Sequence, residues 1–146
     1  MLRKINDRMR SENRGFSLIE VLVVVLVIGI LAAIAIPAFL GQRGKSHDSE
    51  AKSAVRTAAS AAKTFYTENR SFTGMATADV RTVEPSLNQG AASGAGLTVT
   101  VTDADTALVK VKSETGNEFT ITDDAGVATR TCTTGGDAGC PSNSSW

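Results

Sequence analysis

The chain has 146 residues, which is enough for one ordinary domain and an anchor, and its 15 basic and 15 acidic side chains balance to a net charge of zero. The charge is unevenly placed: residues 1–15 hold five basic and two acidic side chains, and the remainder holds 10 basic and 13 acidic ones. A mildly acidic remainder does not favour holding nucleic acid through overall charge, so no nucleic-acid partner is predicted.

A polar, basic leader at residues 1–15 precedes a long apolar run in which Glu20 is the one charged residue before Arg43. As a helix, residues 16–36 would extend about 31 Å, which matches a hydrocarbon core of about 30 Å. Five Lys and Arg precede the run and three lie within residues 41–55. This bias predicts a single-pass membrane segment with a cytoplasmic N-terminus and an exported C-terminal part.

The boundary between leader and apolar run reads Gly-Phe-Ser-Leu-Ile-Glu from Gly15 to Glu20, and Pro37 lies inside the run. These residues resemble the type IV pilin superfamily over roughly the first 40 positions. The resemblance implies that a prepilin peptidase cuts after Gly15 and methylates the new N-terminal Phe16. It also implies that Glu20 pairs with the free amine of a neighbouring subunit during assembly. A second interpretation of Glu20 is that the dipole at a helix N-terminus favours an acid there.

An ordinary secretory signal is the alternative for this segment, because Ala33-Ile34-Ala35 fits a small-x-small cleavage site. An uncleaved membrane anchor is a further alternative. Against the ordinary signal, the apolar stretch is long for a signal core and contains Glu20.

Pro37 lacks a backbone N–H and predicts a kink or local unwinding between Gly29 and Pro37. Small residues in this region also fit close packing between membrane helices.

Residues 45–69 show a helical period of small apolar side chains, and the helix could run continuously from Ser17 to Asn69. The charged side chains, Asp48 among them, are expected to fall largely between the apolar positions. The apolar positions are Ala51, Ala54, Val55, Ala58, Ala61, Ala62 and Phe65.

Residues 71–96 read as a loop because they contain Pro85 and end in a Gly-, Ala- and Ser-rich stretch. Alternating segments then predict an antiparallel meander over residues 97–132, with turn signals between the strands. The strands are expected at 97–102, 107–112, 118–122 and 127–132. The fold class predicted is α+β, a long N-terminal helix packed on a small antiparallel sheet of three or four strands.

Cys132 and Cys140 are the two cysteines, and a disulfide between them would close a short loop within the C-terminal segment, residues 132–146. Loop-closure entropy gives about 2–3 kcal/mol for so short a ring. Two cysteines and the remote His47 are too few ligands for zinc, and His47 reads as a solvated surface residue.

Four aspartates in the strand connections could bind calcium, as in some secretion pseudopilins that this chain resembles, but their spacing fits turns better. They are Asp103, Asp105, Asp123 and Asp124. With no catalytic constellation, no metal ligand set and no cofactor motif, the sequence predicts neither an enzyme nor a cofactor.

The resemblance therefore implies three segments: a leader at 1–15, a transmembrane and filament-core helix at 16–40, and an exported head at 41–146. The function it implies is that of a structural pilus subunit, held in the membrane and then polymerised with its own copies into a surface filament. Its partners would be the prepilin peptidase, an inner-membrane platform protein and, indirectly, an assembly ATPase. Alternatives are a pseudopilin of a type II secretion system, a competence pilin, or a minor pilin acting as an adhesin.

Overall fold

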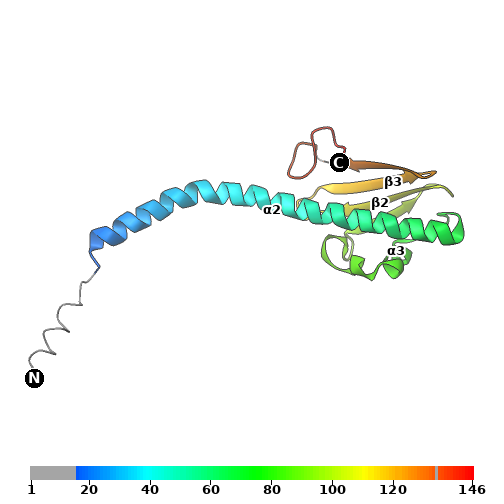
Figure 1. The fold of residues 1–146 in the computed structure, drawn as a ribbon, viewed down its shortest axis with the longest axis horizontal. Coiled ribbons are helices and arrows are strands. Elements are labelled where there is room, and N and C mark those ends of the chain that lie inside the picture. Colours follow the sequence, from blue (N-terminus) through cyan, green and yellow to red (C-terminus); the bar gives the residue numbers. More distant parts are fainter. Residues whose placement is uncertain (1–15, 134) are drawn as a thin grey trace, which may run out of the picture. The chain divides into compact units, whose positions relative to one another are not determined.

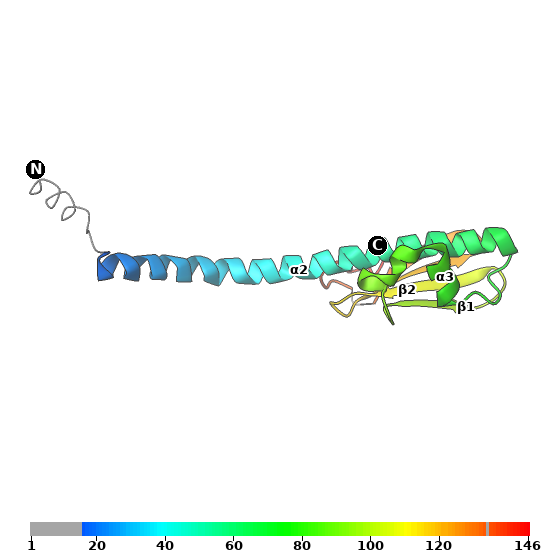
Figure 2. The ribbon, with the colours of Figure 1, turned by 90° about the horizontal axis from the view of Figure 1, so that it is seen from below.

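The computed structural model describes residues 16–133 and 135–146, and the chain divides into two units, Met1–Phe39 and Leu40–Trp146. Figures 1 and 2 show the elements in chain order. The predicted leader and Gly15 lie outside the described residues.

The first element is the helix α2, Leu18–Asn69, 52 residues long. Its first part is built of Val, Ile and Leu, and its second part carries an alanine-rich apolar stripe. Residues 29–37 are helical throughout, so the local unwinding expected there is absent. Pro37 lies inside the helix, and the kink expected at it remains a prediction.

Four antiparallel strands follow in the order β1-β2-β3-β4. Each connection is a short turn, so sequential strands are neighbours and the sheet is a simple meander. Alternation of buried and half-buried residues in β2 and β3 shows that one face is packed and the other is more open. The predicted α+β class is confirmed, with four strands. Their bounds are β1, Leu97–Val101; β2, Thr106–Lys112; β3, Glu118–Asp124; and β4, Val127–Cys132.

The core of the second unit lies between the stripe of α2 and the packed face of the sheet. Val55 and Ala58 on α2 are fully buried, as are Val111 and Phe119 on the strands. Figures 1 and 2 show the second half of α2 lying along the sheet. Alanine keeps the helix surface flat, so the larger side chains of the sheet can fill the space between the layers.

The stretch 71–96 is not a plain loop, as the sequence had suggested. It contains the helix α3, Thr77–Val83, and two 3₁₀ turns, η1 at Pro85–Asn88 and η2 at Gly90–Ala92. The Asp79 carboxylate accepts a hydrogen bond from the Ala76 backbone N–H at 2.7 Å and so closes the first turn of α3. α3, η1 and η2 each bury one residue in the core, Val80, Leu87 and Ala92, and Phe72 and Met75 are buried ahead of them. These scattered positions follow no helical period.

Candidate functional site: an exposed assembly helix and an anchored C-terminal loop

The first part of α2 has an apolar surface on every side. The large apolar side chains from Phe16, just before α2, to Leu40 are 47–82 % exposed, with Phe16 at 82 % and Val27 at 47 %. A helix that is hydrophobic all round belongs in lipid or in a protein core. By length and composition, α2 is long and apolar enough to cross a membrane. This segment therefore needs an apolar environment supplied from outside the single chain.

Glu20 lies at the N-terminal end of this helix and binds locally. Its carboxylate accepts the backbone N–H of Ser17 at 3.0 Å, while the Ser17 carbonyl accepts the N–H of Glu20 at 3.0 Å. This arrangement satisfies one of the backbone donors that a helix N-terminus leaves unpaired. Ser17, whose N–H donates to Glu20, directly follows Phe16. The Glu20 carboxylate therefore lies near the residue whose amine is predicted to become the N-terminus after processing.

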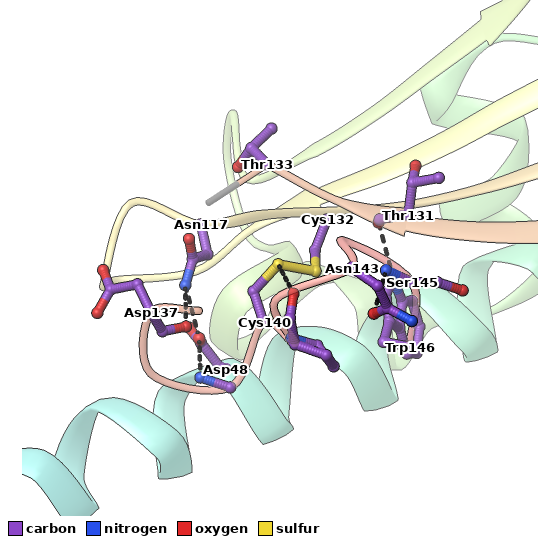
Figure 3. The surroundings of a disulfide bond; sticks show 12 residues. Asp48, Asn117, Thr131, Cys132, Thr133, Asp137, Cys140, Asn143, Ser145 and Trp146 are labelled. Atoms are coloured by element: carbon purple, nitrogen blue, oxygen red, sulfur yellow. Dashed lines mark hydrogen bonds between the residues drawn. A yellow bond between two sulfur atoms is a disulfide. The ribbon is translucent and has the colours of Figure 1, made fainter. Parts of the chain in front are cut away.

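Cys132 and Cys140 form a disulfide, with their Cα atoms 5.9 Å apart, and both are buried. Cys132 is the last residue of β4, and the loop that follows returns to place Cys140 beside it (Figure 3). Since the loop between them is rich in Gly and Thr, it has little apolar surface of its own, and the covalent link holds it against the core.

Asp48 and Lys52 both attach this loop to α2. The Asp48 side chain is fully buried, and the Lys52 ammonium donates to the Gly139 carbonyl at 2.6 Å. The Asn117 side-chain amide donates to the Asp48 Oδ2 at 2.8 Å (Figure 3). The Gly139 N–H donates to the same Oδ2 at 2.8 Å, and the Thr115 hydroxyl donates to the Asp48 Oδ1. One carboxylate thus connects α2, the β2–β3 turn and the disulfide loop.

The pKa of Asp48 lies below its ordinary value of 3.8, although burial alone would raise it. Burial is the largest single influence, but the hydrogen bonds from Ser113, Thr115, Asn117 and the Gly139 backbone together outweigh it. The site therefore holds the ionised carboxylate.

The expectation that Asp48 falls between the apolar positions is wrong. Asp48 lies three residues before Ala51 and seven before Val55, so it continues the buried stripe by one turn. This spacing was the signal available in the sequence. It was indistinct because an aspartate near the boundary of an apolar face is usually solvated.

Trp146 forms a second contact between the C-terminal segment and the rest of the unit. Its indole N–H donates to the Thr131 carbonyl at 2.8 Å, and its ring meets Phe119 edge-on at 5.6 Å between centroids. Three cations approach the same ring: Arg56 at 5.0 Å, Lys52 at 5.7 Å and Arg130 at 5.8 Å. Lys52 and Arg56 lie one turn apart on α2, but no sequence signal joins them to Arg130 and Trp146, which are more than 70 residues further along the chain.

His47 and the turn aspartates have local partners. His47 Nδ1 lies 3.3 Å from a Glu114 oxygen. Asp103 accepts the Asp105 N–H at 2.9 Å, and Asp123 accepts the Gly126 N–H at 2.9 Å, which are side-chain bonds of turns. Within residues 16–133 and 135–146, no three His, Cys, Asp or Glu side chains form a group suited to a metal ion.

The long N-terminal helix and the four-stranded antiparallel sheet are the arrangement that the resemblance of the sequence to type IV pilins implies. Residues 10–36 match the family described as the prokaryotic N-terminal methylation motif. The chain is 45% identical over 70 residues to the type IV major pilin protein PilA of Myxococcus xanthus (strain DK1622), across 48% of this chain and 32% of that protein.

A second relative is the type II secretion system core protein G of Escherichia coli (strain K12). It is 28% identical over 83 residues, across 57% of this chain and 49% of that protein. The matches thus span about a third and about half of the length of these relatives. No solved structure gives a significant match to this chain.

Proposed function

We propose that this chain is a structural subunit of a type IV pilus, held in the membrane after synthesis and then polymerised through the first part of α2. The observation that carries the proposal is the all-round exposure of the large apolar side chains from Phe16 to Leu40. Such a surface is stable first in lipid and later against the same surface of other copies, because both environments exclude water. The similarity to a major pilin supports this assignment over a permanent anchor.

Processing is the first step of the proposed function. A prepilin peptidase removes residues 1–15 after Gly15 and methylates the amine of Phe16, in keeping with the methylation motif matched at residues 10–36. Mass spectrometry of sheared filaments should then find a methylated N-terminal Phe16. A chain beginning at Ile36 would instead mean that an ordinary signal peptidase had cut after Ala35.

Assembly is the second step, and Glu20 is its proposed polar contact. Inside a filament core an unpaired carboxylate costs several kcal/mol, and pairing with the Phe16 amine of a neighbouring copy removes most of that cost. The platform protein and, indirectly, the assembly ATPase would supply the extraction from the cytoplasmic membrane, and the filament would lie outside the cell.

Glu20→Ala tests this step. The variant should accumulate in the membrane at normal levels and enter filaments poorly, while the matched loss of an exposed acid further along α2, Glu68→Ala, should assemble normally. Filament yield is measured relative to total membrane-bound subunit. If the Glu20 variant assembled like wild type, its role would be limited to the Ser17 contact at the helix N-terminus.

The pseudopilin of a type II secretion system is the second candidate, favoured by the similarity to core protein G. Abundance separates the two, since a major pilus subunit should dominate sheared surface filaments. A competence pilin or a minor, adhesive pilin would be a small fraction of them. Folding that requires calcium would favour the secretion pseudopilin.

A further inference from the structure

Three cations gather around Trp146 on the second unit, and we call Lys52, Arg56 and Arg130 the basic surface. None of them forms an ion pair with a carboxylate of residues 16–133 and 135–146. Arg56 and Arg130 are exposed, and all three lie within 5.8 Å of one ring. Like charges this close repel each other, so the basic surface is suited to an anionic partner. Because Phe119 and the cations already contact the ring, the surface presents charge more than an open aromatic face.

Three exposed carboxylates gather at the other end of the sheet, and we call Asp103, Asp105 and Asp124 the acidic turns. Thr106 pairs with Asp124 across β2 and β3, which places the β1–β2 turn beside the β3–β4 turn. The three carboxylates accept hydrogen bonds from neutral donors: the Asp105 N–H, the Tyr66 hydroxyl and the Thr106 hydroxyl. The acidic turns therefore keep their negative charge.

The two surfaces are too far apart to neutralise each other within one copy. Asp105 is held by Tyr66, which lies ten residues beyond Arg56 on α2 and so about 15 Å along the helix axis. Arg130 lies three residues along β4 from Val127, the partner of Asp124, which is about 10 Å. Both separations reach or exceed the screening length of about 8–10 Å at physiological ionic strength.

We propose that the basic surface of one copy binds the acidic turns of a second copy in the filament. This inference rests on the proposed function. Copies that share a core of parallel helices are displaced from each other along those helices. A displacement of about 15 Å, the length of α2 that separates the two surfaces, brings the acidic turns of one copy to the level of the basic surface of another. The contact is heterologous, so it repeats along a filament without closing.

Charge reversal with rescue tests the contact. Arg130→Glu places a carboxylate opposite the acidic turns, and Asp124→Lys places a cation opposite the basic surface. Each single variant should reduce sedimentable filament by about three- to tenfold relative to the membrane pool, because like charges then face each other. The double variant Arg130→Glu with Asp124→Lys should restore most of the loss.

The matched control is Arg130→Glu combined with Glu114→Lys, which has the same net charge as the rescuing pair. Glu114 lies in the β2–β3 turn, outside both surfaces, so this pair should stay defective. Circular dichroism and urea unfolding of each detergent-solubilised variant check that its fold is intact. If wild type gives no filaments, the proposed function fails.

If wild-type filaments form, single reversals with a normal yield of sedimentable filament would overturn the contact. That outcome would leave the basic surface free for an anionic polymer outside the filament. Failure of the double variant to recover, with its fold intact, would also overturn the proposal.

Discussion

Replacing Asp48 by Ala should weaken the attachment of the disulfide loop to α2 and leave the hydrogen bond from Lys52 to the Gly139 carbonyl. The Gly139 N–H would lose its acceptor, and the Asn117 amide would keep only a weaker bond to the Asp137 carbonyl at 3.4 Å. Thr115 can turn to the Ser113 hydroxyl at 3.2 Å, so its loss is small. Two hydrogen bonds to a charged group at about 1.5–3 kcal/mol each, reduced by the desolvation cost that the buried carboxylate no longer incurs, leave a net loss of about 2–4 kcal/mol.

Asp48→Asn should lower the free energy of unfolding less, by about 1 kcal/mol, because its remaining side-chain oxygen can still accept hydrogen bonds from the Gly139 N–H and the Asn117 amide. Its new amide group can donate to the Thr115 hydroxyl, which accepts as well as donates. The difference between the two variants separates the loss of hydrogen bonds from the loss of charge.

Urea unfolding in detergent measures these effects, with Trp146 as the reporter since it is the one tryptophan in the chain. For a domain of this size m is about 1–1.5 kcal/mol/M, so Asp48→Ala should lower the midpoint by roughly 1.5–3 M. Asp137→Ala, which removes an exposed carboxylate from the same loop, is the control and should leave the midpoint nearly unchanged. An unchanged midpoint in Asp48→Ala would falsify the assignment of Asp48 as the anchor of the loop.

Three further predictions concern the same site. Because the folded-state pKa of Asp48 is below 3.8, its ionisation stabilises the fold fully above that pH. That contribution should be lost as the pH falls from 3.8 through the folded-state pKa. In an acid titration, the free energy of unfolding should therefore depend less on pH in Asp48→Asn than in wild type. Gly139→Ala would place a Cβ 2.7 Å from the Asp48 Cβ, so it should destabilise by about 1–3 kcal/mol in the urea assay, and normal stability would mean that the loop can shift freely. Replacing Cys132 and Cys140 together by Ser should lower the free energy of unfolding by about 2–3 kcal/mol, and after reduction wild type and variant should unfold at the same urea concentration. A difference that persists under reducing conditions would point to the substitutions themselves.

The sequence was informative wherever a local pattern carried the signal. The apolar run from Phe16 to Leu40 is too long and too uniform for a soluble surface, so a helix that needs an outside partner followed directly. The four strands were equally readable, since alternation of Val, Ile and Thr between Gly and Asp turns is a property of neighbouring residues. With two cysteines in the chain, the disulfide partner was also a local inference.

The tertiary structure decided what depends on residues distant in the chain. Asp48 became an anchor only because the Thr115–Asn117 turn and Gly139 fold onto it, 67 to 91 residues later. The cations around Trp146 come from α2 and β4, and no spacing in the sequence joins Arg130 to Lys52 and Arg56. The short helices of 71–96 depend on a few contacts with the core and not on helical periodicity. Local patterns follow from the chain's own geometry, whereas buried polar sites and charge clusters arise from the packing of elements that the sequence keeps apart.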